Sequence, residues 1–316
     1  MNTFGDKWCF TSFGESHGKA IGGVLDGVPA GIRIDLDLIR TELERRRGLT
    51  GDGLPATGVS PRAVREADEV EWLSGVVTNE GTNELTSEGL ITLGTPIGFI
   101  IRNTDARPED YEWLKNHYRV GHADKVYEHK YGIRDWRGGG RASARETAAR
   151  VVAGSIAKQQ LREKGITIAA QLVQVGAEKD AMKFAETIAA YQREGDSIGG
   201  IVECRIQGLK AGVGEPIFNK LQAELAFAVM SINACKGFEY GTGFGGVTEP
   251  GSVINGISGG IAGGISDGSE VVFRCVFKPT PSTPKAGVKG RHDACVATRA
   301  VPVVEAMTAL TLVNLS

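Results

Sequence analysis

The 316-residue chain lacks the features that would tie it to a metal, a membrane or a polyanion. Its five cysteines are widely spaced and form no C-x-x-C pair, which argues against a zinc site and a disulfide framework and favours reduced thiols. No run of about 18 apolar residues occurs, and the chain begins without an apolar segment, so we expect neither a membrane span nor a signal peptide. The 36 basic and 38 acidic residues nearly balance, which gives no overall attraction to nucleic acid or anionic lipid. We therefore expect a cytoplasmic protein whose partners are small molecules.

Common nucleotide and metal motifs are also missing. There is no P-loop and no H-E-x-x-H sequence, and the histidines show no spacing typical of a metal site, so we expect no metal. The run 241–246 is close to G-x-G-x-x-G, but we predict no strand before it and no helix after it, which argues against a Rossmann site. Glycine, in contrast, is abundant: 44 glycines against 11 prolines indicate many tight turns and close backbone approaches.

The most informative stretch is 138–147, where three glycines run into a predicted helix. Ser143 and Glu146 have the spacing of a capping box, and apolar residues recur at helical spacing until 164–165. Arg141 and Arg145 add positive charge where the free N–H groups of the helix N-terminus meet the glycine loop. This pattern predicts an anion site; a glycine turn that merely lets a helix start is about equally consistent with it.

Two histidines lie in glycine-containing loops. His17 belongs to the segment 13–18, which matches G-x-S-x-G with Ser16 as the serine, but the residues after it read as a strand and not as the helix of a hydrolase elbow. We expect His17 to be an exposed imidazole that exchanges protons near pH 7, or else a histidine bonded to a turn carbonyl. His122 is followed by Asp124, which either orients it or pairs with Lys125.

The remaining pattern predicts a mixed fold without a parallel β-α-β rhythm. Asp35 or Asp37 caps a helix that ends in three arginines at 45–47, which either complement the helix dipole or grip a phosphate. Strands are predicted at 97–101, 166–175, 201–206 and 271–277, and helices at 178–193, 216–236 and 301–312. The length suits one large domain or two ordinary ones.

The motifs FGESHG, RRRG, GHAD, GGGRASARET, SINACKG, GGIAGGIS, FKPT and GRHDACV occur in this order along the chain. In order and spacing they resemble the chorismate synthase family over nearly the whole chain. The resemblance implies an α+β fold, a β-α-β sandwich with a helical core between two largely antiparallel sheets, in one domain covering 1–316. It also implies a homotetramer that eliminates phosphate and a ring proton from 5-enolpyruvylshikimate 3-phosphate with reduced FMN, giving chorismate in the shikimate pathway of aromatic amino acid biosynthesis.

The resemblance further implies the site residues. His17 and His122 would be acid/base groups, and Asp293 would help a proton pass from the substrate through the flavin. Arg46 and Arg145 would bind the substrate. The FMN pocket would be lined by Arg141, Ser143, Asn233, Ala234, Ser258, Lys278, Thr280, Ser282 and Arg291. The absence of a dinucleotide fingerprint favours an external flavin reductant over reduction by the chain's own use of NADPH.

The chain departs from the family pattern at several places. Val120, Ala142 and Ala294 replace residues that are usually proline, serine and proline, and the arginine expected shortly after RRRG has no counterpart. Segments before 253 and between 284 and 289 are shortened. These departures leave a second possibility beside the enzyme, a homologue that binds flavin but is catalytically impaired. The G-x-S-x-G match leaves a third, with less support, a serine hydrolase that uses Ser16.

Overall fold

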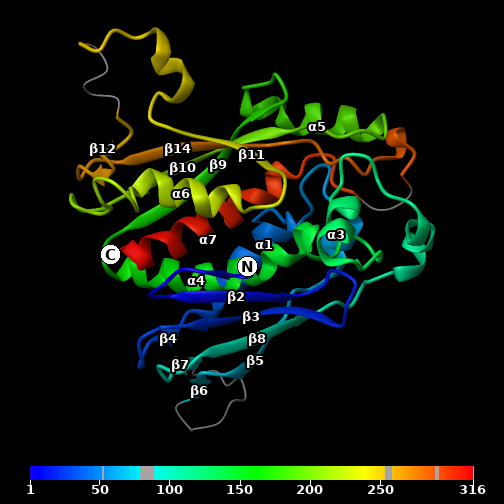
Figure 1. The fold of residues 1–316 in the computed structure, drawn as a ribbon, viewed down its shortest axis with the longest axis horizontal. Coiled ribbons are helices and arrows are strands. Elements are labelled where there is room, and N and C mark those ends of the chain that lie inside the picture. Colours follow the sequence, from blue (N-terminus) through cyan, green and yellow to red (C-terminus); the bar gives the residue numbers. More distant parts are fainter. Residues whose placement is uncertain (52, 79–88, 253–257, 289–291, 316) are drawn as a thin grey trace.

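Two antiparallel sheets enclose a layer of helices (Figure 1). The computed structural model describes residues 1–51, 53–78, 89–252, 258–288 and 292–315. The first sheet has the strand order β1 (Thr3–Phe4), β2 (Cys9–Gly14), β3 (Ala20–Asp26), β8 (Ile97–Arg102) and β5 (Val70–Ser74). The second has the order β11 (Cys235–Tyr240), β14 (Val271–Phe277), β10 (Gly200–Gln207) and β9 (Thr167–Val175). The α+β fold expected from the resemblance is confirmed.

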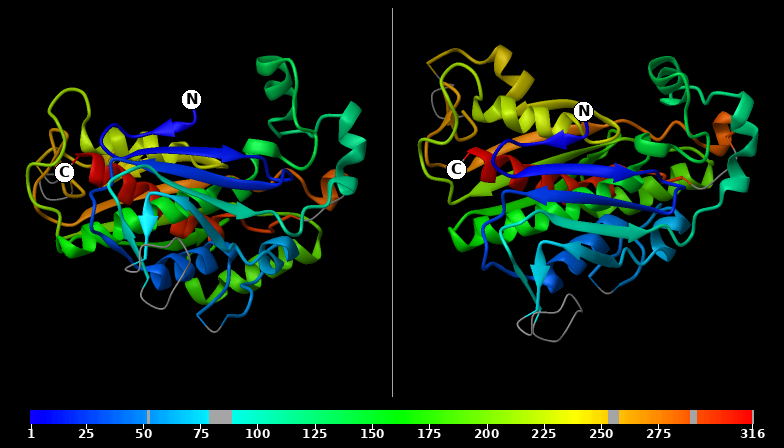
Figure 2. Two further views of the ribbon diagram at one scale, coloured as in Figure 1. Left: turned by 90° about the horizontal axis from the view of Figure 1, so that it is seen from below. Right: turned by 60° about the horizontal axis from the view of Figure 1, so that its bottom comes forward.

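Helices α1 (Leu36–Arg47), α4 (Thr147–Glu163) and α7 (Ala297–Leu315) form the middle layer. Helices α4 and α7 pack closely, because a Cβ atom at Gly154 would overlap Ala306 on the facing helix. Strands β2 and β3, blue in both views of Figure 2, pack against α4, whereas α7 packs against β9 and β10 of the second sheet. Helix α7 is buried along nearly its whole length, and its Thr308 and Thr311 hydroxyls donate to carbonyls one turn earlier.

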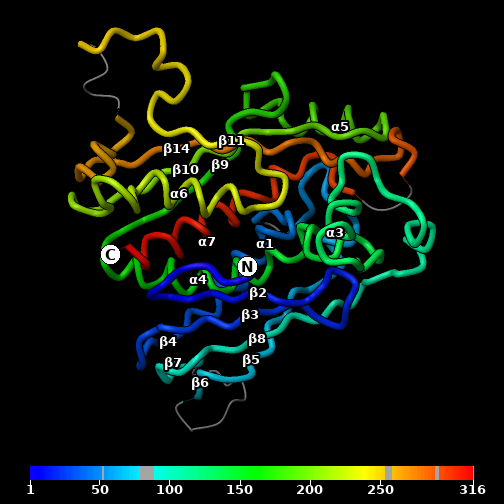
Figure 3. Tube along the Cα trace, in the orientation of Figure 1, coloured from blue at the N-terminus to red at the C-terminus, as the bar shows by residue number. Residues whose placement is uncertain are grey.

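The smaller elements lie around these layers. A three-stranded sheet contains β4 (Arg33–Ile34), β7 (Leu90–Thr92) and β6 (Val76–Val77), and a hairpin contains β12 (Ile261–Ala262) and β13 (Ile265–Ser266). The outer helices are α2 (Pro61–Arg65), α3 (Asp124–Tyr131), α5 (Phe184–Arg193) and α6 (Leu221–Met230). Figure 3 shows that the chain between β8 and α3 runs out along one edge of the molecule before it returns. No helix of the described ranges is both long and apolar enough to cross a bilayer.

Several predicted elements are present with changed bounds. Asp35 is the cap of α1, since its carboxylate accepts from Leu38 N at 2.8 Å. The helix predicted at 216–236 is wrong at both ends: it begins at Leu221, because Asn219 has φ +58° and the Leu221 N–H binds Gly264 O. Its predicted last residues form the start of β11, so a strand does precede the run 241–246. That strand belongs to an antiparallel sheet, which leaves no Rossmann unit.

The helix predicted to begin within the stretch 138–147 is present, with a short 3₁₀ turn before it. Ser143 caps a 3₁₀ turn, Ala144–Glu146, and its hydroxyl accepts from Arg145 N at 3.3 Å. Helix α4 continues from Thr147 and ends at Glu163. The helix therefore begins with a tighter turn than the capping-box pattern indicates, which is common at helix N-termini.

Candidate active site

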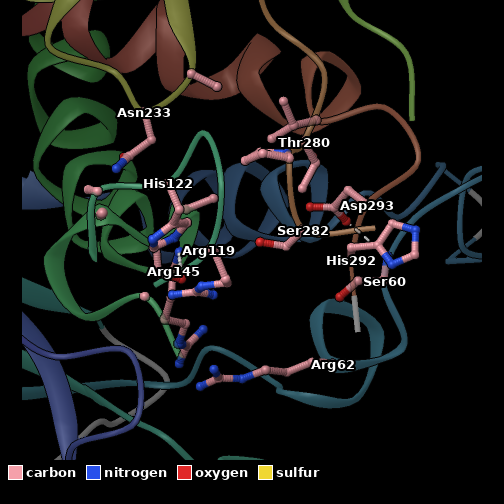
Figure 4. A pocket seen from close by; sticks show the side chains of 18 of the residues that line it. Ser60, Arg62, Arg119, His122, Arg145, Asn233, Thr280, Ser282, His292 and Asp293 are labelled. Atoms are coloured by element: carbon pink, nitrogen blue, oxygen red, sulfur yellow. Dashed lines mark hydrogen bonds between the residues drawn. The ribbon is translucent and has the colours of Figure 1, made fainter. Parts of the chain in front are cut away.

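A cavity of about 410 Å³ lies between loops from distant parts of the chain (Figure 4). Its wall is rich in positive charge. The basic lining residues are Arg46, Arg62, Arg119, Arg145, Lys278 and Arg299, beside three histidines, His17, His122 and His292. The two carboxylates among the lining residues are Glu66 and Asp293. A pocket of this size with convergent polar groups and an excess of cations suits a small anionic ligand.

His17 lies in the turn between β2 and β3, at the wall of the cavity. It is buried, not exposed as we predicted, because neighbours close on the ring from several sides. Its Nδ1 lies 3.0 Å from Ser16 Oγ, and the Tyr111 ring meets it edge-on at 4.8 Å between centroids. Gly138, with φ +64°, packs so closely that a Cβ there would overlap the imidazole. The absence of a side chain at Gly138 therefore leaves the space that the His17 ring occupies.

His122 is held by a buried acid. Its Nδ1 lies 2.8 Å from Asp124 Oδ1, at the start of α3, and Asp124 also accepts two hydrogen bonds from the Arg119 guanidinium. Burial opposes ionisation of Asp124, but the hydrogen bonds from Arg119 and His122 outweigh it and hold the pKa of the carboxyl well below its usual range. Of the two roles predicted for Asp124, the structure shows the contact with His122. The imidazole therefore turns its Nε2 edge toward Gly139, which also lines the cavity.

Arg46 and Arg145 share one buried carboxylate. Arg46 Nη2 lies 2.7 Å from Asp68 Oδ2, and Arg145 Nη1 donates to the other oxygen of Asp68. Burial lowers the pKa of Arg46 to about 10, and the nearby Arg299 and Arg145 add to this effect while Asp68 opposes it. Burial also opposes ionisation of Asp68, but the two arginines dominate and lower its pKa. Two fixed cations facing one carboxylate leave the wall with excess positive charge.

Asp293 lines the opposite part of the cavity, and both of its carboxylate oxygens are engaged. Oδ1 accepts the Ser60 N–H at 2.9 Å, and Oδ2 accepts from Arg299 Nη1 at 2.7 Å. Arg299 also donates from Nε to the carbonyl of Arg46 at 2.9 Å. The carboxylate of Asp293 is thus fixed in one orientation, beside His292 (Figure 4).

Six of the residues expected around FMN line this same cavity. They are Ser143, Asn233, Ala234, Lys278, Thr280 and Ser282. The buried Oδ1 of Asn233 has no hydrogen-bond partner among the described residues, and Ala234 has φ +68°, a conformation rare outside glycine. Lys278 Nζ donates to Gly121 O at 3.2 Å, and burial, with Lys236 nearby, lowers its pKa.

The structure places two other expected FMN residues outside this cavity. The Arg141 guanidinium turns to β2, where it donates to Gly14 O at 3.1 Å and to Ser12 Oγ, and it lines a separate hollow of about 680 Å³. Ser258 lines a third hollow of about 870 Å³, next to Phe244 and Ile261. Arg291 lies outside the described residues.

Sequence reasoning missed Arg62, Glu66, Tyr111, Arg119 and Arg299, all of which line the cavity. Arg62 and Glu66 carried a local signal, because a Pro-Arg pair followed four residues later by glutamate is typical of a short helix with an ion pair. Arg299 carried none, since it lies in the apolar pattern of α7.

Comparison with known proteins is consistent with this geometry. Residues 8–316 match the family described as chorismate synthase. The chain belongs to the chorismate synthase family. It is 43% identical over 367 residues to the chorismate synthase of Phocaeicola vulgatus, covering 99% of this chain and 97% of that one. It is 43% identical over 369 residues to that of Porphyromonas gingivalis, covering 99% and 95%. A solved structure titled "Crystal Structure of Chorismate Synthase" matches with a TM-score of 0.74 and 28% identity, covering 99% of this chain and 92% of that one.

This family membership makes the chain an enzyme of the chorismate synthase type. The alignments with the relatives are longer than the chain itself, so segments of the relatives have no counterpart here.

Proposed function

We propose that the chain converts 5-enolpyruvylshikimate 3-phosphate to chorismate, by 1,4-elimination of phosphate and a ring proton with reduced FMN. The observation that carries the proposal is the cavity of a chorismate synthase family member, where six basic residues face two carboxylates and two fixed histidines. The substrate and the leaving phosphate are anions, which this excess of cations would stabilise.

The arginines would act as fixed donors for the phosphate. Arg46 and Arg145 are held by Asp68, so they keep their positions when charge grows on the leaving oxygen. Donors that are already oriented need no reorganisation as the C–O bond breaks. Their hydrogen bonds become strongest to the oxygen atoms on which negative charge develops.

His122, His17 and Asp293 would handle protons. His122 is fixed through Nδ1 by Asp124, which leaves Nε2 to give or take a proton in the cavity. His17, enclosed by Ser16, Tyr111 and Gly138, would protonate or hydrogen-bond an oxygen of the leaving group. Asp293, kept in place by Ser60 and Arg299, would accept the ring proton.

The donor set fits a flavin. The orphaned Oδ1 of Asn233 is an acceptor for a ring N–H, and the Lys278 ammonium with the Ser282 hydroxyl suits a carbonyl or phosphate edge. When bound, reduced FMN would supply electron density for the elimination without net redox change. Arg141 would act on the flavin only through Asn233, whose Nδ2 donates to the Arg141 carbonyl at 3.5 Å, because the Arg141 guanidinium faces β2. The reductant would be external.

The proposal includes a cytoplasmic homotetramer. Large apolar side chains lie exposed on neighbouring surfaces of α6 and the 3₁₀ segment Gly243–Thr248, among them Phe227, Phe244 and Val247. Such residues suit a contact with further copies of the chain. Light scattering tests this, and a stable monomer at working concentration would contradict it.

The test of the activity is anaerobic turnover with dithionite-reduced FMN, followed by chorismate absorbance. A folded, flavin-loaded protein that makes no chorismate would leave the alternative of an impaired flavin-binding homologue. The hydrolase alternative has little support, because Ser16 is buried outside the lining residues of the cavity and is followed by strand β3. Labelling of Ser16 by a fluorophosphonate probe would revive it.

A further inference from the structure

Arg150 lies outside the lining residues of the cavity, yet it holds the turn that carries Asn233. It belongs to helix α4, shortly after the stretch 138–147, and its side chain is 16% exposed. The turn, residues 231–234, joins α6 to β11 and contributes Asn233 and Ala234 to the cavity wall. Figure 4 shows the Asn233 side chain among those that line the cavity. Arg150 is therefore one step removed from the site at which we place the flavin.

The Arg150 guanidinium joins the start of α4 to the end of α6. Nε donates to Glu146 Oε2 at 3.1 Å, and Nη2 lies 3.0 Å from the other oxygen of the same buried carboxylate. Nη1 donates to Ser231 Oγ at 2.6 Å, and Nη2 donates to Ser231 O at 3.1 Å. The Ser231 hydroxyl gives its own hydrogen to Ala228 O, so it accepts from Arg150. Because the guanidinium is planar and its donors form a rigid fork, these contacts fix how the two segments lie relative to each other.

A second contact between the same two segments involves Asn233 itself. Its Nδ2 donates to Arg141 O at 3.5 Å, and its buried Oδ1 has no hydrogen-bond partner among the described residues. A hydrogen bond this long orients an amide only weakly. The direction of Oδ1 therefore depends mainly on the backbone of the turn 231–234.

The backbone of this turn is strained. Ala234 has φ +68°, a left-handed conformation that is unfavourable for a residue with a Cβ. Such a conformation persists where the surrounding contacts determine it. After the turn, Lys278 N donates to Ala234 O at 2.9 Å, and before it, Ser231 receives the Arg150 guanidinium. Without Arg150, the turn would lose its link to α4.

We propose that Arg150 is a positioning residue, which orients the Asn233 amide for the flavin by holding Ser231 against α4. Its role rests on the function proposed above, in which Asn233 Oδ1 accepts a ring N–H of FMN. Arg150 acts through the turn and contacts neither flavin nor substrate. An acceptor that is already aimed at the ring N–H binds it without a further loss of conformational freedom, so a misdirected Asn233 weakens FMN binding.

The test is a double-mutant cycle on FMN affinity. Quenching of flavin fluorescence measures it with oxidised FMN and no substrate, so that no turnover occurs. Arg150→Gln should bind FMN about 5- to 20-fold more weakly, because a charge-assisted link is lost. Asn233→Ala should weaken binding at least as much, and the double variant should match Asn233→Ala to within about twofold, because Arg150 acts through Asn233. Arg162→Gln, at an exposed position in the last turn of the same helix, is the matched control and should change FMN affinity by less than about twofold.

Additive losses in the double variant would overturn the proposal, because Arg150 would then act independently of Asn233. Parental FMN affinity in folded Arg150→Gln would overturn it too; a lower free energy of unfolding with that affinity would mean that Arg150 only caps α6. If circular dichroism shows that Arg150→Gln does not fold, Ser231→Ala removes one of the two contacts at an exposed residue. It should weaken FMN binding by about fivefold, and parental affinity in that variant overturns the proposal.

Chorismate formation by the parent separately decides the proposed function, because FMN affinity is measured without turnover. A parent protein that binds FMN but makes no chorismate would refute the proposed reaction and leave the role of Arg150 to the double-mutant cycle. A parent protein that binds no FMN would refute the proposed cofactor and, with it, this role of Arg150.

Discussion

Arg45 and Arg46 are consecutive residues of α1, yet they belong to two different kinds of buried charge network. Arg45 joins Lys158, Glu42 and Glu305, a set in which two cations meet two carboxylates. Arg46 faces the cavity, where basic side chains outnumber acidic ones. The first network lies where α1, α4 and α7 meet, and the second lies where the loops converge.

The two arginines respond to their surroundings in opposite ways. The hydrogen bonds of Arg45 to Glu305 outweigh its burial and raise its pKa, whereas burial lowers the pKa of Arg46 to about 10. Glu305 is saturated: besides Arg45 and Lys158, it accepts the Ala170 N–H at 2.8 Å. A balanced, saturated network serves the fold, while a network with excess charge of one sign is left for a ligand of the other sign.

The largest expected effect is on turnover. His122→Ala should lower the rate of chorismate formation by about 10²–10⁴-fold, since it removes the proposed general acid/base group. His17→Ala should fall in the same range, and Asp293→Asn should slow removal of the ring proton. Chorismate absorbance with reduced FMN measures the rate, and circular dichroism of the same samples checks folding. Parental rates in folded variants would remove these residues from the mechanism.

In the balanced network around Glu305, we expect a substitution to change the free energy of unfolding and to leave turnover unchanged. Glu305→Gln leaves Arg45 and Lys158 with one carboxylate, Glu42, and should lower the free energy of unfolding by about 3–5 kcal/mol. Urea unfolding measures this, with Glu44→Gln, at an exposed position of the neighbouring helix α1, as the control. Turnover per folded molecule should stay at the parental value; a loss of turnover as large as that of His122→Ala would erase the distinction between the networks.

The same network should also affect how the stability of the protein falls at acidic pH. Burial opposes ionisation of Glu305, but Arg45 and Lys158 outweigh it, so its pKa is lower in the folded protein. Its contribution to stability is therefore fully present above the unfolded pKa of about 4.3 and is lost as the pH falls through the folded value. Glu305→Gln should reduce the loss of urea stability between about pH 5 and pH 3. An unchanged acid slope would show that other carboxylates, such as Asp68 and Asp124, account for it.

The features of the fold and the site that the sequence predicts are those set by contacts between residues that are close in sequence. The cap at Asp35, strand β14 and the helix after Ser143 depend on neighbouring residues, and local pattern predicted them. The burial of His17 depends on Gly138, which is distant in sequence. The different ion pairs of Arg45 and Arg46 likewise depend on Glu305 and Asp68, which lie far along the chain from α1. The glycine loops singled out His17 and His122, and the family resemblance supplied their expected roles and the expected FMN residues, but only the three-dimensional structure shows that the Arg141 guanidinium faces β2.

The smallest expected effect sharpens the comparison on a single helix. Arg40 of α1 pairs with Asp37 at 2.8 Å, and both side chains are largely exposed, at 69% and 82%. Water and salt screen such a pair, so Arg40→Gln should change the free energy of unfolding by less than about 1 kcal/mol and leave turnover unchanged. Urea unfolding of Arg40→Gln and Arg45→Gln under the same conditions makes the test. Three arginines on one helix would then differ by environment alone: Arg40 exposed, Arg45 balanced and Arg46 at the cavity. A loss from Arg40→Gln as large as that from Arg45→Gln would mean that helix charge, and not the buried partner, sets the stability of α1.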